Sequence, residues 1–142
     1  DLDKAKSLID SAVRAGTDSV KFQTYLTDKR VPKDSPIFDI LKQCELPFDA
    51  FEKLKNHADA QNIEFFSTPF DEESVDMLIE LGVKAFKIAS FDSVNLPLLK
   101  YVASKKKPII LLGLLAKVLA LAMLINITEW EFGLLIYKIK IN

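Results

Sequence analysis

Two lysines lie inside short runs that otherwise have the composition of buried β-strands. Lys21 is in residues 20–24 (VKFQT), and Lys87 is in residues 86–90 (FKIAS). Side chains alternate along a strand, so Gln23 shares one face of its strand with Lys21. Burying an unpaired ammonium group is costly. Each lysine, considered alone, is therefore expected either to form an ion pair or to lie at a strand end with its ammonium group in water. Two lysines at corresponding places favour a shared anionic ligand, such as a phosphate or a carboxylate.

Hydroxyl and carboxylate side chains follow two of the predicted strands. Thr68 follows residues 63–66 (IEFF), and Ser90 and Asp92 follow residues 86–89 (FKIA). The carboxyl ends of parallel strands form the ligand-binding rim of α/β enzymes, where hydroxyls and helix N-termini suit a phosphate. Ordinary helix capping would also explain Thr68 and Ser90, and Asp92 fits either a cap or an acid and base group.

The apolar pattern predicts that strands and helices alternate along most of the chain. Strands are expected at residues 19–25, 63–68, 85–90 and 108–112, and helices at residues 3–15, 48–61, 71–81 and 95–105. This order predicts an α/β fold with a parallel sheet of right-handed βαβ units, either a doubly wound sheet or a barrel. A full eightfold barrel takes about 250 residues, so about four βα units would form roughly half of one.

The composition is that of a globular domain without a strong electrostatic field. The 142 residues are 49% hydrophobic and 27% charged, with a formal net charge of −1. This balance argues against nucleic acid or an anionic membrane surface as a partner. The single cysteine, Cys44, excludes an internal disulfide framework and fits a reducing, cytoplasmic location. The single histidine, His57, is expected to be a solvated residue on the outer face of its helix.

The two ends of the sequence differ in character from its central part. Residues 1–4 (DLDK) lack the basic and apolar regions of a signal peptide, and we expect further residues upstream. Residues 111–127 are apolar apart from Lys117, and this run is shorter than the roughly 20 residues of a membrane span. We therefore expect an α/β domain at residues 1–111 and a divergent apolar tail at residues 112–142.

Four short motifs follow one another through the predicted α/β domain. They are VKFQT at residues 20–24, STPF at 67–70, KIAS at 87–90 and NLPLL at 95–99. In this order and spacing they resemble the N-terminal catalytic domain of the sialic acid synthase family, which includes N-acetylneuraminate, legionaminate and pseudaminate synthases and a related spore-coat polysaccharide protein. The resemblance implies a partial (β/α)8 TIM barrel of about four βα units.

The resemblance also implies a reaction between phosphoenolpyruvate and an N-acyl amino sugar. In this family, carbon 3 of phosphoenolpyruvate joins the aldehyde carbon of the open-chain sugar, and C–O cleavage releases phosphate. The chain would then be part of a transferase of carbohydrate biosynthesis that forms a C–C bond. Positions that hold or adjoin phosphoenolpyruvate in the family are matched here by Lys21, Gln23, Thr68, Lys87 and Ser90.

Asp92 matches a family residue at the reacting centre, where many relatives have a glutamate in a Gly-Ser-Gly-Glu motif. The version at residues 89–92 (ASFD) is closer to the legionaminic and pseudaminic branch. The family uses a divalent metal, Mn2+ or Mg2+, held by two histidines from later strands, and this chain contains neither of them. Relatives form dimers, so the resemblance implies a homodimer.

Two other interpretations stay open. One is a catalytically inactive, truncated fragment of such an enzyme. The other is a different barrel enzyme that binds a phosphorylated metabolite, in which case phosphoenolpyruvate would not compete for the site.

Overall fold

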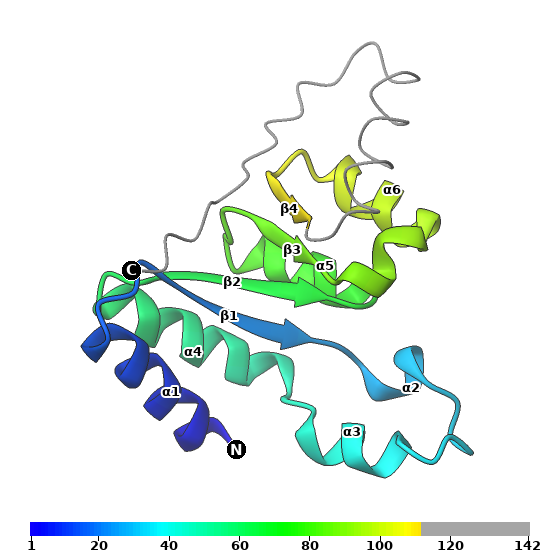
Figure 1. Cartoon of the computed structure of the whole chain (residues 1–142), viewed down its shortest axis with the longest axis horizontal. Helices are drawn as coiled ribbons and strands as arrows, with labels where there is room; N and C mark the ends of the chain where they lie inside the picture. Colours follow the sequence, from blue (N-terminus) through cyan, green and yellow to red (C-terminus); the bar gives the residue numbers. More distant parts are fainter. Residues whose placement is uncertain (112–142) are drawn as a thin grey trace.

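Four parallel strands form the centre of the protein (Figure 1). The computed structural model describes residues 1–111. Within these residues, the strands pair in the order of the sequence: β1 (Ser19–Thr24), β2 (Glu64–Pro69), β3 (Phe86–Ile88) and β4 (Ile109–Leu111). The predicted parallel sheet and the approximate positions of its strands are confirmed.

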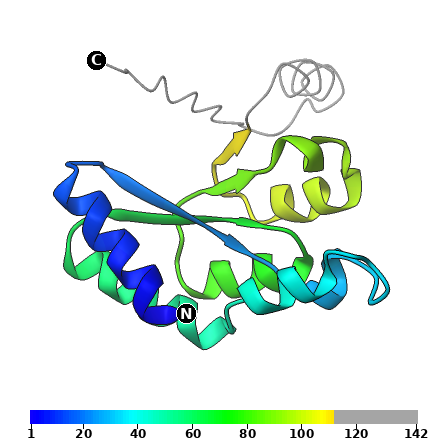
Figure 2. The same ribbon diagram turned by 60° about the horizontal axis from the view of Figure 1, so that its bottom comes forward.

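The helices that connect the strands distinguish between the two sheet architectures that the sequence left open. They are α1 (Leu2–Arg14) before β1, α4 (Phe48–Ala60) between β1 and β2, α5 (Glu72–Glu80) between β2 and β3, and α6 (Leu96–Ser104) between β3 and β4. In Figure 2, α1, α4 and α5 lie on the same side of the sheet. A doubly wound sheet reverses its strand order and has helices on both faces, whereas a barrel keeps sequential order with helices outside. The fold is therefore α/β, and its four strands form part of a (β/α)8 barrel.

Three short helical segments occur in connections where the sequence predicted none. They are α2 (Thr27–Arg30), α3 (Phe38–Cys44) and the 3-10 helix η1 (Ser90–Val94). α2 lies just beyond the arrowhead of β1 in Figure 1, and η1 begins two residues after β3. Both segments therefore lie at the carboxyl ends of strands, where barrel enzymes bind their ligands.

Apolar side chains fill the space between the sheet and the helices. Phe51 and Leu54 of α4, Phe65 of β2, Leu78 of α5 and Phe86 of β3 are all fully buried. Because these side chains come from helices and strands that alternate in the sequence, their burial fixes the strands relative to one another.

Two helices end at glycines with a left-handed backbone. Gly16, which follows α1, and Gly82, which follows α5, both have a φ of 71°. Only glycine adopts this conformation without a steric penalty, so both positions act as helix stops.

His57 of α4 is half-buried, so the prediction of a solvated outer-face residue is wrong. Its Nε2 lies 2.7 Å from Oδ1 of Asp10 on α1, and the Gln61 amide donates to the same oxygen at 2.8 Å. The periodicity of α4 alone could not reveal that α1 packs along this side of it. The histidine therefore has a structural role, joining two helices.

No helix within residues 1–111 is long and apolar enough to cross a membrane. The divergent apolar tail predicted at residues 112–142 lies outside the described residues. The cytoplasmic location stays a prediction.

Candidate functional site

Four of the predicted site residues lie on the face of the sheet that points away from the helices: Lys21, Gln23, Thr68 and Lys87. The register of β1 and β2 places Gln23 directly beside Thr68. The register of β2 and β3 places Thr68 and Lys87 at neighbouring positions. Lys21 is two residues before Gln23 and so points to the same side. Three adjacent strands therefore bring these side chains together on one surface, which we call the cationic face.

The two lysines of the cationic face have no carboxylate to neutralise them. No carboxylate oxygen within residues 1–111 lies within 4.0 Å of either ammonium group. Lys21 is exposed, whereas Lys87 is half-buried. Burial lowers the pKa of Lys87, repulsion from Lys21 lowers it further, and the Asp92 carboxylate acts in the opposite direction. An anion placed on this face would relieve the repulsion and favour the charged form of Lys87.

The hydroxyl of Thr68 lacks a hydrogen-bond partner within the described part of the chain, although the residue is only 1% exposed. On the opposite face of the same strands, the buried hydroxyls of Thr24 and Ser67 satisfy each other at 2.8 Å. Helix capping does not explain Thr68, because the cap of α5 is Asp71. A buried hydroxyl without a partner costs about 1 to 3 kcal/mol, so Thr68 is suited to donate to a ligand oxygen.

Ser90 and Asp92 lie in η1, directly beyond the carboxyl end of β3. Ser90 is exposed and Asp92 is half-buried. Burial raises the pKa of Asp92, and it is opposed by a hydrogen bond from Asn95 and by the charges of Arg30 and Lys87. Oδ2 of Asp92 is buried without a hydrogen-bond partner among residues 1–111. A carboxyl group with a raised pKa takes up and releases a proton closer to neutral pH, which suits proton transfer.

Two carboxylates hold the loop that follows β1 against the rest of the rim. Asp71 accepts from the backbone N–H of Leu26 at 2.8 Å with Oδ2 and from that of Ser74 at 2.7 Å with Oδ1. Glu45 accepts from the backbone N–H of Thr27 at 2.7 Å. Charge-assisted bonds of this kind are short and directional, so they fix α2 beside the ends of the strands.

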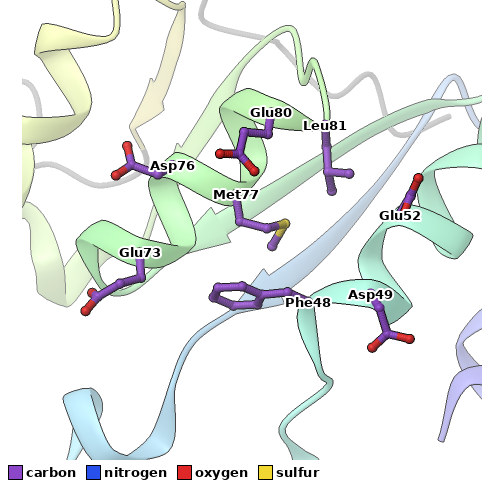
Figure 3. Close-up of a pocket in the computed structure, with 8 residues that line it drawn as sticks. All are labelled: Phe48, Asp49, Glu52, Glu73, Asp76, Met77, Glu80 and Leu81. Atoms are coloured by element: carbon purple, nitrogen blue, oxygen red, sulfur yellow. The ribbon is translucent and has the colours of Figure 1, made fainter.

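A hollow of about 410 Å³ lies between α4 and α5, on the helix side of the sheet (Figure 3). It is lined by apolar and mostly acidic side chains: Phe48, Asp49, Glu52, Glu73, Asp76, Met77, Glu80 and Leu81. Three of its carboxylates already pair with lysines, at distances of 2.6 to 2.9 Å. An acidic hollow on this side does not suit an anionic substrate, so we place the candidate site on the cationic face instead.

The described residues do not fit a divalent metal. Residues 1–111 contain no group of three or more histidine, cysteine, aspartate and glutamate side chains that could hold an ion. Asp92 is the carboxylate whose charge interacts with that of Lys87 on the cationic face. No role in this part of the chain is therefore assigned to a metal.

The parallel strands, the helices outside them and the polar groups at their carboxyl ends define the class of the protein, a partial (β/α) barrel. Its family follows from direct comparison. The chain belongs to the NeuB family, whose model matches residues 8–118. The resemblance to sialic acid synthases that the motifs indicated is thereby confirmed.

Named relatives and a solved structure agree with this assignment. The N,N'-diacetyllegionaminic acid synthase of Legionella pneumophila is 41% identical over 125 residues, covering 78% of this chain and 35% of the relative. The pseudaminic acid synthase of Helicobacter pylori is 30% identical over 125 residues, covering 78% and 37%. The crystal structure of an N-acetylneuraminic acid synthetase from Leptospira borgpetersenii has a TM-score of 0.79 and 32% identity, covering 88% and 45%. The chain thus spans about a third of the length of these curated relatives.

Sequence analysis did not single out two residues that shape the rim. Asp71 had a recognisable signal, because an aspartate three residues before Ser74 at a helix start is a typical cap. Arg30 had none, because the apolar pattern predicted no helix there and its aromatic neighbours, Tyr25 and Phe70, follow two different strands.

Proposed function

We propose that this chain is the phosphoenolpyruvate-binding part of an enzyme that condenses phosphoenolpyruvate with an N-acyl amino sugar to form a nonulosonic acid. The relatives named as legionaminic and pseudaminic acid synthases support the product class. The observation that carries the proposal is the pair of lysines, Lys21 and Lys87, on one face without carboxylate partners. Phosphoenolpyruvate supplies the two anionic groups, a phosphate and a carboxylate, that such a pair would bind.

Each polar residue of the face has a role in this proposal. Lys21 and Lys87 attract the phosphate and the carboxylate, and the unsatisfied hydroxyl of Thr68 donates to one of their oxygens. Gln23, beside Thr68 in the register, and Ser90, at the start of η1, complete the polar surroundings of the anion. Binding at this face also orients carbon 3 of phosphoenolpyruvate toward the rim, where η1 lies.

Asp92 is the proposed proton-transfer group. In the condensation, carbon 3 of phosphoenolpyruvate forms a bond to the aldehyde carbon, and the aldehyde oxygen takes up a proton. Water adds at carbon 2, and the C–O bond to phosphate breaks, so that phosphate leaves. The half-buried Asp92 carboxyl, whose pKa is raised by burial, is suited to supply the proton to the aldehyde oxygen.

The metal, dimer and substrate identity that the resemblance implies belong to the whole enzyme. A divalent metal would polarise the aldehyde, and the steps above use only residues of this chain. The choice among amino sugars, the homodimer and the cytoplasmic location stay predictions.

Calorimetric titration with phosphoenolpyruvate tests the proposed function. We expect saturable binding to the full chain, and Lys21→Ala and Lys87→Ala should each weaken it by about 1.5 to 3 kcal/mol, because each removes a charge-assisted contact. Lys84→Ala is the matched control. Lys84 precedes β3, is exposed and forms an ion pair with Glu64. Inorganic phosphate should bind more weakly, because it lacks the carboxylate.

Equal phosphoenolpyruvate binding in the wild type, Lys21→Ala and Lys87→Ala would refute the assignment of the cationic face. Tighter binding of inorganic phosphate than of phosphoenolpyruvate would favour another phosphorylated metabolite. If circular dichroism shows that the chain is folded and it still does not bind phosphoenolpyruvate, the result would support the interpretation as an inactive fragment.

A further inference from the structure

Arg30, the last residue of α2, packs against two aromatic rings. Its guanidinium carbon lies 3.9 Å from the ring centroid of Phe70 and 4.7 Å from that of Tyr25. The two rings are buried and meet edge to face at 6.2 Å, and the Tyr25 hydroxyl donates to the Leu41 carbonyl at 3.0 Å. Tyr25 and Phe70 directly follow β1 and β2, so the guanidinium is fixed at the carboxyl ends of these strands. Such stacking restricts the orientation of its N–H donors.

In the described part of the chain, the guanidinium of Arg30 contacts two aromatic rings and no carboxylate. Within residues 1–111, no carboxylate oxygen lies within 4.0 Å of its guanidinium group. Other basic residues near it are paired: Lys29 with Glu73 at 2.9 Å, and Lys42 with Glu45 at 2.9 Å. The planar guanidinium carries five N–H donors that match oxygen acceptors well, so an unpaired one that is fixed by stacking is suited to bind a ligand.

Arg30 and the cationic face act on the same carboxyl group from separate elements. The charges of Arg30, on α2, and of Lys87, on β3, both act on Asp92. Oδ2 of Asp92 is buried without a partner among residues 1–111, and so is the Thr68 hydroxyl. If phosphoenolpyruvate occupies the lysines and Thr68, the group that reacts with it lies beside Asp92. The donors of Arg30 are then available to the molecule that brings this group.

We propose that Arg30 binds the second substrate, the amino sugar, through an oxygen acceptor, and that it thereby determines which sugar is accepted. This inference rests on the proposed function, because it needs phosphoenolpyruvate on the cationic face. The acceptor is either the carbonyl oxygen of an acyl group or an oxygen of a terminal phosphate, since an arginine fork binds both. A purely structural arginine would be expected to donate to protein oxygens, whereas Arg30 has no carboxylate partner among residues 1–111.

Calorimetry on the full chain in saturating phosphoenolpyruvate tests this inference. The probes are a 2-acetamido-2-deoxyhexose, the same sugar with a phosphate on carbon 6, and a 2,4-diacetamido sugar. Arg30→Ala should weaken binding of the accepted sugar roughly ten- to hundredfold, the range for a lost charge-assisted contact, and should change phosphoenolpyruvate affinity less than about twofold. Lys29→Ala removes a charge from the same helix and should change neither affinity. Arg30→Lys keeps the charge but not the fork, so it should restore only part of the lost affinity.

Each outcome separates the possibilities. A larger loss for the phosphorylated sugar identifies a phosphate as the acceptor, whereas equal losses with and without phosphate identify the acyl carbonyl. Unchanged sugar affinity in Arg30→Ala, or a wild-type chain that binds phosphoenolpyruvate but none of the sugars, would overturn the inference alone. Loss of phosphoenolpyruvate affinity in Arg30→Ala would move Arg30 into the phosphoenolpyruvate site. A wild-type chain that does not bind phosphoenolpyruvate would overturn the proposed function as well.

Discussion

Replacing Asp71 should destabilise the protein by breaking the connection between the loop after β1 and the start of α5. Asp71 is 8% exposed, and its carboxylate accepts two backbone N–H bonds, from Leu26 at 2.8 Å and from Ser74 at 2.7 Å. Each bond to a charged group contributes about 1.5 to 3 kcal/mol, so Asp71→Ala should lower the free energy of unfolding by about 3 kcal/mol or more. Urea unfolding followed by circular dichroism measures this difference.

Asp71→Asn distinguishes the contributions of the two hydrogen bonds to stability. The asparagine oxygen can still cap α5 through Ser74, but the amide group that replaces Oδ2 is a donor and cannot accept from Leu26. We therefore expect a loss of about half that of Asp71→Ala, roughly 1.5 kcal/mol. Glu72→Ala, which changes an exposed residue one position later, should stay within about 0.5 kcal/mol of the wild type. An Asp71→Ala variant that unfolds at the same urea concentration as the wild type would refute the argument.

Three further predictions concern burial and charge. Phe65→Ala should cost about 3 to 5 kcal/mol in urea unfolding because Phe65 is fully buried, whereas Leu8→Ala, at 57% exposure, should be close to neutral. Ser67→Ala should cost about 1 to 3 kcal/mol because it leaves the buried Thr24 hydroxyl unpaired, and adding Thr24→Val should cost less than the sum of the single changes. Burial raises the pKa of Asp92, so the folded state holds this proton to higher pH and loses stability as pH rises above about 4. Asp92→Asn should therefore be more stable than the wild type at pH 7, and unfolding curves at pH 7 that show it less stable would contradict this.

Local rules predicted the residues of the cationic face because strand alternation depends only on the chain's own geometry. Lys21 and Gln23 share a face as expected, and the parallel register adds Thr68 and Lys87 beside them. The parallel direction of the strands followed from the alternation of helices and strands. The choice of a barrel over a doubly wound sheet came only with the family resemblance and the observed order, since both folds share the same local pattern.

Features that depend on contacts between distant segments could not be predicted in this way. His57 follows the outer-face pattern of its own helix, yet α1 covers it and brings Asp10 within hydrogen-bond distance. Arg30 is positioned by contacts with Tyr25 and Phe70, which are separated by more than forty residues in the sequence. No local pattern encodes either contact, because both arise from packing between separate βα units.

The titration of Lys87 tests the central claim, that Lys21 and Lys87 form one anion site, most directly. Nuclear magnetic resonance of isotope-labelled lysines gives the pKa of Lys87 in the free chain, in Lys21→Ala and in saturating phosphoenolpyruvate. Burial and repulsion from Lys21 lower this pKa in the free chain, so we predict that it rises in Lys21→Ala and rises again when phosphoenolpyruvate binds the wild type. A Lys87 pKa that is the same in all three samples would contradict the claim.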